Sequence, residues 1–370
     1  MAFRLNKKLK KRLAAIVLLA LLILLLILLA NYPAVVEKYY SRGFYRFICI
    51  VLHAMLNIFP FSIGDILYIL VVAGLIVAVA KIITSLFKRK FEQALKFFLT
   101  IIIGIETGIV IFYLFWGMNY YRIPAAERLG YKNTTYTTNQ LKKITLILID
   151  STNATRARLI DADMRTPNDS IYKTAVAAVK QLSETSVNFR TYSPKVKPSA
   201  LTPLINYLST SGYYNPFTAE AQINFKMPVQ LRPFVACHEL SHQMGFGFED
   251  EASFAGFIAG VNSNDKLLRY SVYYEGMREF MIALGGVDTI AFKQYKKRLS
   301  GRVRADLKAE REYWQYYEGR LEVISGIFYD KFLKANNQPQ GLATYNQMVT
   351  LVMAWYNRQP GTHKVPVKVR

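Results

Sequence analysis

The chain has 370 residues, of which 52% are hydrophobic, and its formal net charge is +22 at pH 7. The two cysteines, Cys49 and Cys237, have no spacing that suggests a disulfide framework or a cysteine zinc site. Much of the positive charge falls in two short clusters, and no basic recognition motif is present, which argues against a nucleic-acid partner. The remaining excess suits a protein close to anionic lipid head groups.

Three apolar segments, near residues 13–30, 66–83 and 97–116, are long enough to cross a bilayer, which takes about 20 helical residues. The first is too long for an ordinary cleaved signal peptide, so we interpret it as a retained anchor. The third contains Glu106, which we interpret as a protonated or helix-paired carboxyl rather than a transport pathway. A shorter stretch, 47–59, is predicted to lie in the interface or against the bundle.

Lysine and arginine residues predict the orientation of these segments. The N-terminal tail is basic between Arg4 and Arg12, and so is the loop between the second and third segments, from Lys88 to Lys96. Basic loops stay in the cytoplasm, so three spans place everything after Asn119 on the other side. We therefore expect a multi-pass protein of the cytoplasmic (inner) membrane. Residues 1–118 would form its membrane domain and residues 119–370 its extracytoplasmic domain.

The C-terminal domain is predicted to be mainly α with a small sheet. Helical spacing of apolar residues covers 139–150, 169–182 and the long stretch 303–336, and Thr344 resembles the cap of a last helix that ends near residue 355. Residues 222–226 alternate weakly and are a candidate strand. From its position alone, we expect this strand to be the edge to which an extended peptide adds.

The sequence His238-Glu239-Leu240-Ser241-His242 points to zinc chemistry. On a helix the two histidines are one turn apart, so both imidazoles can reach one Zn²⁺ ion. Glu239 is then placed to act as the general base toward a water molecule that zinc acidifies. Gly245 follows at the position where a helix commonly ends. Burying these three groups together without a metal would be costly.

A catalytic zinc site needs a third protein ligand, and the nearest candidates are Glu249 and Glu251. The two lie about 200° apart on a helix, so only one can face the metal. The face of Glu249 continues through the small residues Ala252, Ser253 and Gly256, which lets two helices approach closely. This favours Glu249, and Glu251 remains the alternative.

The motif followed by Glu-x-x-Ala resembles the gluzincin peptidases, in which the first glutamate of Glu-x-x-Ala-Asp or Glu-x-x-Ala-Asn is the third ligand. The resemblance implies a zincin-like α+β domain, with Glu249 as ligand and Ser253 at the position that supports a zinc-bound histidine. This chain has serine where those proteins have aspartate or asparagine. The whole chain also resembles a family of uncharacterised bacterial membrane proteins, through WGMNYYR, CHELSHQMGF and YDKFLKANNQPQGLATY.

These patterns favour a membrane-anchored, zinc-dependent endopeptidase with Glu239 as base and His238, His242 and Glu249 as ligands. Its partners would be the lipid bilayer and a peptide or protein substrate. The alternatives are a non-catalytic scaffold with a structural or vestigial zinc site and, ranked last, a transporter suggested by Glu106. Candidate donors to the oxyanion are tyrosines downstream of the motif, namely Tyr270, Tyr273, Tyr274 and Tyr345.

Overall fold

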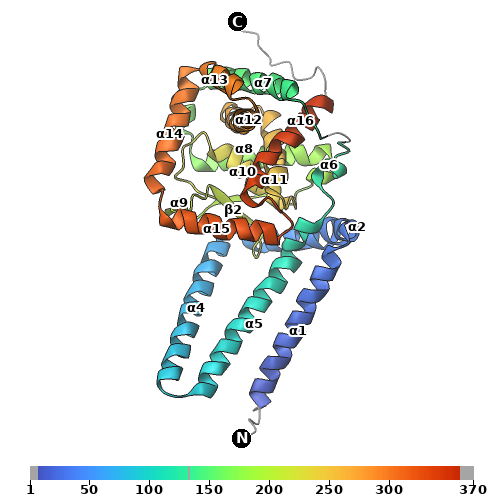
Figure 1. The fold of residues 1–370 in the computed structure, drawn as a ribbon, viewed down its shortest axis with the longest axis vertical. Coiled ribbons are helices and arrows are strands. Elements are labelled where there is room, and N and C mark those ends of the chain that lie inside the picture. The colour runs from blue at the N-terminus through green and yellow to red at the C-terminus, as the bar shows by residue number, and fades with distance from the viewer. Residues whose placement is uncertain (1–6, 132–133, 359–370) are drawn as a thin grey trace.

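The computed structural model describes residues 7–131 and 134–358. Three long helices extend from one end of a larger, mainly helical domain that carries a small sheet (Figure 1). In the first part of the chain lie α1 Lys7–Ala30, α2 Pro33–Val35, the π-helix η1 Val36–Phe44, α3 Tyr45–Leu56, α4 Ile63–Phe87, α5 Phe91–Phe115 and the 3₁₀ helix η2 Gly117–Tyr121.

The rest of the chain forms the domain, whose elements up to the sheet are α6 Ala125–Arg128, α7 Thr138–Ala157, η3 Asp163–Arg165, α8 Asn168–Thr185, η4 Val187–Phe189, β1 Val196–Pro198, α9 Thr202–Asn206, β2 Gly212–Asn215 and β3 Glu220–Ile223. They are followed by α10 Arg232–Gln243, α11 Glu249–Val261, α12 Lys266–Val287, α13 Thr289–Lys297, α14 Gly301–Tyr317, α15 Arg320–Ala335, η5 Gly341–Gln347 and α16 Met348–Arg358.

The three predicted spans are confirmed as helices that are long and apolar enough to cross a membrane, namely α1, α4 and α5. Helix α5 packs against both of the others. The start of α1 and the turn between α4 and α5 lie at the same end of the bundle, away from the domain (Figure 1). The basic residues at the start of α1 and those in this turn therefore lie at the same end of the bundle, as the predicted three-span topology requires.

The segment 47–59 lies in a helix that runs across the bundle where it meets the domain (Figure 1). This helix is continuous from α2 through η1 to α3, and the segment occupies α3 and the turn after it. One face packs inward through Tyr45 and Cys49, while Phe47 and Met55 are exposed. Such an amphipathic helix is typical of the membrane interface.

In the domain, α10, α11 and α12 pack against one another and are surrounded by the other helices (Figure 1). Apolar side chains from α7, α8, α12 and α16 join those of α10 and α11 in one core. The sheet has the order β1-β3-β2, with β1 parallel and β2 antiparallel to β3. Strands β2 and β3 both contact α10, so the sheet lies directly against the helix that carries the histidines.

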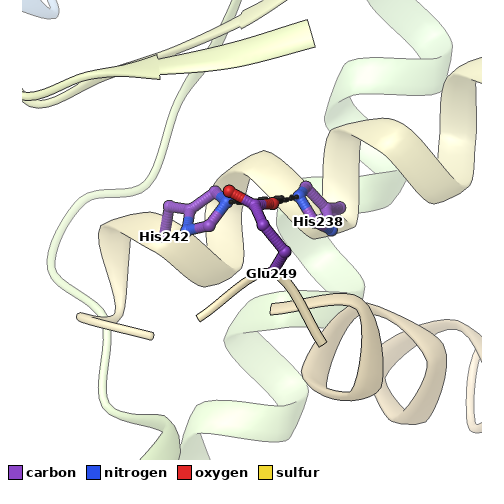
Figure 2. Close-up of side chains that lie close together, drawn as sticks. All are labelled: His238, His242 and Glu249. Carbon is purple, nitrogen blue, oxygen red and sulfur yellow. Dashed lines mark hydrogen bonds and ion pairs between the residues drawn. The ribbon is translucent and has the colours of Figure 1, made fainter. Parts of the chain in front are cut away.

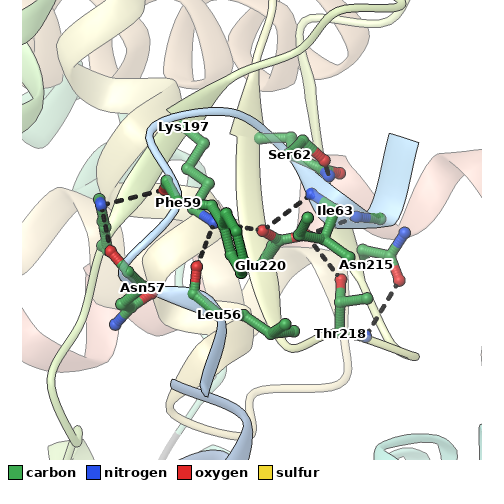
Figure 3. Close-up of polar contacts among 12 residues, drawn as sticks. Leu56, Asn57, Phe59, Ser62, Ile63, Lys197, Asn215, Thr218 and Glu220 are labelled. Atoms are coloured by element: carbon green, nitrogen blue, oxygen red, sulfur yellow. Dashed lines mark hydrogen bonds and ion pairs between the residues drawn. The ribbon is translucent and has the colours of Figure 1, made fainter. Parts of the chain in front are cut away.

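Helix α4 begins on this sheet, where its first N–H groups are satisfied by a buried carboxylate (Figure 3). The backbone N–H groups of Ile63 and Gly64 donate to Glu220, at 3.2 and 2.6 Å. Glu220 also pairs with Lys197 of β1 at 2.5 Å, and both side chains are buried. A carboxylate is favourable at a helix N-terminus, which carries partial positive charge. This joint fixes one membrane helix to the domain.

Three expectations about elements are wrong. Strand β3 covers Glu220–Ile223 and is the central strand of the sheet, so it cannot be the edge that a peptide joins. The stretch 303–336 is two helices, α14 and α15, which separate at Glu318 and Gly319. Thr344 lies inside η5, and α16 begins only at Met348. In each case the position or the end of the element depends on contacts between segments distant in the sequence, which a local pattern does not contain.

Candidate metal centre

Helix α10 carries the HExxH motif and is buried along nearly its whole length. Pro233 stands in its first turn, where a missing N–H costs nothing. Near the same end, the backbone N–H of Phe234 donates to Ser271 Oγ at 2.9 Å. His238 and His242 follow one turn apart, so their side chains project from the same side of the helix.

The end of α10 positions His242. Gly245 has a positive φ of 84°, and its N–H donates to the carbonyl of His242 at 3.0 Å. The N–H of Phe246 donates to Ser241 O at 3.3 Å, which completes a Schellman motif. This turn brings the carbonyl of Phe246 within 2.7 Å of His242 Nδ1. The glycine that ends the helix therefore also sets the orientation of one imidazole.

Helix α11 brings Glu249 to the histidines. Its small residues allow the close approach expected from the sequence, since a Cβ at Gly256 would lie 3.0 Å from the backbone nitrogen of His238. Glu249 is the first residue of α11 and is 3% exposed. Its side chain points back toward α10 and meets both imidazoles (Figure 2).

Three potential ligand atoms form a compact triangle. Glu249 Oε2 lies 3.1 Å from His238 Nε2 and 3.4 Å from His242 Nε2, and the two nitrogens are 3.2 Å apart. Metal–ligand bonds of about 2.0–2.1 Å at tetrahedral angles put neighbouring ligands about 3.3–3.4 Å apart. The triangle therefore fits a tetrahedral zinc ion. Among the residues that the structure describes, this is the one such group of histidine, cysteine and acidic side chains.

Each member of the triangle is held by a further contact. Ser253 Oγ lies 3.1 Å from His238 Nδ1, and the carbonyl of Phe246 holds the corresponding nitrogen of His242. With Nδ1 engaged, each ring presents Nε2 to the centre. Tyr329 of α15 donates its hydroxyl to Glu249 Oε1 at 2.8 Å, so the other carboxylate oxygen is left to face the histidines.

Glu239 lies beside this centre against strand β2. It is 3% exposed, and within the described chain its Oε2 atom has no hydrogen-bond partner. Its Oε1 atom lies 2.9 Å from where a Cβ would stand at Gly212. Because a buried polar atom without a partner is costly, it usually has a chemical reason. Here both residues line the same cavity as the metal triangle, so this carboxyl group lies in the wall of the candidate site.

Burial and charge shift the pKa values of these groups in the metal-free protein. Burial raises the pKa of Glu239 to about 8, and repulsion from Glu249 adds to the shift. Burial lowers the pKa of His238. Burial also opposes protonation of His242, but the Glu249 carboxylate outweighs it and raises the pKa to about 9. A cation bound here would take the place of the proton that Glu249 favours.

A cavity of about 760 Å³ leads to the triangle. Its apolar walls come from the spans and the sheet and include Tyr68, Phe112, Trp116, Tyr213 and Tyr214. Residues of α15, among them Glu322 and Tyr329, close another side.

A second cavity of about 250 Å³ shares His238, Glu239 and Gly212 with the first and continues past them. It is lined by Glu275, Glu279 and Glu310 against a single cation, Arg278. The larger cavity is therefore rich in aromatic side chains, whereas the smaller one has a cluster of acidic side chains.

The alternative ligand Glu251 lies elsewhere. Its carboxylate accepts from the backbone N–H of Ala125 at 2.5 Å and from Arg128 at 3.1 Å, and it is buried. It therefore stabilises the contact between α11 and α6, whereas Glu249 joins the histidines.

The candidate tyrosines are also engaged away from the centre. Tyr270 and Tyr274 donate to Asp306 and Glu310 at 2.5 Å, and Tyr273 packs edge-on against Phe257. The side chain of Tyr345 lies outside the described residues.

Two residues from the first part of the chain complete the end of α10. Trp116 donates its Nε1–H to the carbonyl of His242 at 3.0 Å. Tyr45 donates its hydroxyl to the carbonyl of Gln243 at 2.9 Å. The last carbonyls of a helix have no partner within the helix, so these donors satisfy groups that burial would otherwise leave unpaired. The only sequence signal for them is the aromatic motif that contains Trp116.

Comparison with known proteins gives a family but no activity. No curated protein and no solved structure matches the chain. Residues 40–353 match the family described as protein of unknown function (DUF3810). The match runs from η1 to α16, so it includes α4, α5, the HExxH helix, Glu249 and Tyr329. The chain therefore belongs to the DUF3810 family.

Proposed function

We propose that this protein is a membrane-bound, zinc-dependent endopeptidase. The observation that supports this proposal most directly is the arrangement of four buried side chains. His238, His242 and Glu249 form a triangle of tetrahedral dimensions, and the carboxylate of Glu239 stands beside it with one oxygen unpaired. A purely structural site would have no use for a fourth, unpaired acid facing the same cavity.

The chemistry divides among these residues. When bound by the triangle, zinc would supply the Lewis acidity that polarises a carbonyl group and makes water a stronger acid. Glu239, which a neighbouring cation keeps ionised despite its burial, accepts the proton of the attacking water and returns it to the leaving amine. Ser253 and the carbonyl of Phe246 keep Nε2 of each imidazole directed at the centre. Tyr329 leaves Glu249 one oxygen for coordination.

We expect an extended peptide to bind along the edge strand β2 rather than along the central strand β3. In the described chain the outer edge of β2 has no strand partner. Gly212, Tyr213 and Tyr214 of this strand line the cavity, and Gly212 lies against Glu239. A peptide that adds to this edge gains backbone hydrogen bonds and passes the candidate base. Its side chains would then meet the aromatic cavity on one side of Glu239 and the acidic cavity on the other.

The test is the metal content of purified full-length protein, followed by peptide hydrolysis. We expect about one zinc per chain in the wild type and its loss in His242→Ala and Glu249→Ala. Glu251→Gln is the matched control, because it removes a buried acid from the same helix but should keep the metal. Glu239→Gln should retain zinc and lose the hydrolysis that the wild type shows on a peptide library supplied both in solution and anchored in lipid vesicles.

Two outcomes would overturn the proposal. Absence of zinc in wild type after reconstitution would show that the triangle does not bind the metal. Bound zinc with no hydrolysis that depends on Glu239 would favour the non-catalytic scaffold.

A further inference from the structure

We propose that α15 lies in the membrane surface, and that the candidate site opens into the bilayer between α4, α5 and α15, so that its substrate is a membrane-anchored polypeptide. The inference about substrate rests on the proposed function, whereas the position of α15 does not. Three observations lead to it: the two faces of α15, the place of this helix in the fold, and the origin of the cavity walls.

Helix α15 has apolar residues on the face that points away from the protein. Leu321, Ile324 and Phe328 follow one another at helical spacing and are exposed, Phe328 by 70%. Val323 and Ile327 are exposed next to them. The opposite face, with Ser325 and Tyr329, lines the cavity. Such a row of large apolar side chains on a polar-flanked helix marks an interaction surface.

The position of α15 identifies what covers that face. The helix lies crosswise at the end of the domain from which α4 and α5 emerge (Figure 1). Its C-terminal part contacts α5, since Phe332 packs edge-on against Phe112 and Asn336 accepts from Tyr113 at 3.2 Å. The continuous helix α2–α3, with its own exposed apolar face, also crosses the bundle at the junction with the domain. The exposed face of α15 thus lies at the same end of the domain as the spans and the helix α2–α3.

Charge on α15 agrees with a lipid surface. Arg320 and Lys331 are exposed at its two ends, and Lys334 pairs with Asp330 in its last turns. Basic side chains that flank an apolar helical face favour the head-group layer of a bilayer containing anionic lipid. A helix in this position stays in the plane of the interface and does not span.

The walls of the larger cavity come from the spans themselves. Tyr68 lies in the second turn of α4 and Phe112 in the last turn of α5, and both line the cavity together with Tyr329 of α15. The two spans are close at their connecting turn and farther apart at the domain (Figure 1). The mouth that these helices frame therefore lies at the level of the lipid head groups, where a polypeptide held in the bilayer can enter.

A depth measurement tests the position of α15 without any assumption about activity. The single substitution Phe328→Cys would carry an environment-sensitive fluorophore in full-length protein, reconstituted in phosphatidylcholine–phosphatidylglycerol vesicles. The native Cys49 and Cys237 are buried, which limits background labelling. The matched control is Ile290→Cys on α13, which is equally exposed at 71% but lies at the far end of the domain.

We expect lipids with a spin label on the acyl chain to quench the Phe328 reporter several-fold more than the Ile290 reporter. Equal quenching at the two positions would overturn the proposal. An apolar emission spectrum at Phe328 without lipid quenching would also overturn it, because a second copy of the chain would then cover the face.

The substrate class is tested with two matched peptide pools. One pool carries a randomised segment fused to a single transmembrane helix, and the other carries the same segment without the helix. We expect cleavage of the anchored pool in vesicles, dependent on Glu239, with little cleavage of the soluble pool. Equal cleavage of both pools would agree with endopeptidase activity, but it would contradict the proposal that the substrate is anchored in the membrane. Cleavage of neither pool would overturn the peptidase, and the fluorescence result alone would then decide the position of α15.

Discussion

Among single residues, Ser253 shows how a small side chain can support a candidate metal ligand. Its hydroxyl lies 3.1 Å from His238 Nδ1, and the peptidase motif that this sequence resembles has a longer carboxylate or amide at this position. Because α10 and α11 approach closely at Gly256, serine is long enough to reach the ring. The geometry of the helix pair therefore compensates for the length of the side chain.

We predict that Ser253→Ala weakens zinc binding about 10- to 100-fold, since removing a partner of a ligating histidine commonly has this effect. Competition with a chromophoric chelator measures the affinity. Ser241→Ala is the control, because the hydroxyl of Ser241 donates only to the Cys237 carbonyl of its own helix. Equal affinities in wild type and Ser253→Ala would show that Ser253 does not orient the ligand.

Gly212 is the residue where β2 and Glu239 come closest. An added Cβ would lie 2.9 Å from Glu239 Oε1, from the carbonyl of Gln222 and from Val235. We predict that Gly212→Ala retains zinc but lowers kcat/KM for peptide cleavage at least tenfold, because β2 or the base must move. Gly286→Ala, which meets no atom within 4 Å, should leave kcat/KM unchanged. Unchanged cleavage in Gly212→Ala would contradict the role of this edge.

The sequence singled out the four residues at the centre because they are close along the chain or fit a helical period. Tyr329 and Trp116 were missed for the opposite reason. They come from helices distant in sequence, and in a chain with 25 tyrosines no local feature distinguishes one. His238 and His242 lie on one helix, so their proximity follows from their spacing in the sequence. The hydrogen bond from Tyr329 to Glu249 joins two helices that are distant in the sequence and therefore depends on the fold.

Among the elements, η1 is tied to the loop after η2 by a buried ion pair. Arg122 binds Glu37 through two nitrogens, at 2.7 and 2.9 Å, and its third nitrogen donates to the carbonyl of Gly245 at 2.8 Å. Burial disfavours the Glu37 carboxylate, but Arg122 outweighs it and lowers its pKa from 4.5 to about 2. The π-helix is thereby linked to the turn that ends α10.

This pKa predicts a dependence of stability on acid. A carboxyl whose pKa is lower in the folded state stabilises the protein above its unfolded value of 4.5 and loses that contribution as pH falls toward about 2. In detergent, the melting temperature of the wild type should therefore fall more steeply across this window than that of Glu37→Gln. Glu312→Gln, which alters an exposed pair with Lys308, should follow the wild type. Parallel curves for wild type and Glu37→Gln would contradict the prediction.

Local pattern was sufficient for the spans and for α8, which have continuous apolar faces, and for the first part of α7, which continues beyond the expected end at residue 150 to Ala157. It was insufficient at Gly319, where apolar residues continue on both sides of the break between α14 and α15. It also did not identify β3 as central, because the pairing of β1 with β3 joins residues 25 positions apart, such as Val196 and Ala221. Strand order depends on the whole fold and not on a window of sequence.

For the molecule as a whole, the described part of the N-terminal basic cluster, at the start of α1, and the basic turn between α4 and α5 lie at the end of the bundle opposite the domain. We predict that a cysteine at Lys88 reacts with a membrane-impermeant maleimide only from the cytoplasmic side, and that one at Ile290 reacts only from the other side. Labelling of intact and permeabilised spheroplasts measures this. Reaction of both cysteines from the same side would exclude the three-span topology.

The bonds at the end of α10 have a practical consequence for anyone who wishes to isolate the domain. A fragment that begins at Asn119 would lack Trp116 and Tyr45, which satisfy the carbonyls of His242 and Gln243. It would also lack the start of α4, and Lys197 and Glu220 would then face water at the edge of the sheet. Trimming the chain to obtain a water-soluble domain would remove contacts that support the candidate ligands themselves. A preparation that keeps these supports therefore contains α3, α4 and Trp116, together with the membrane segments, in a nanodisc or detergent micelle.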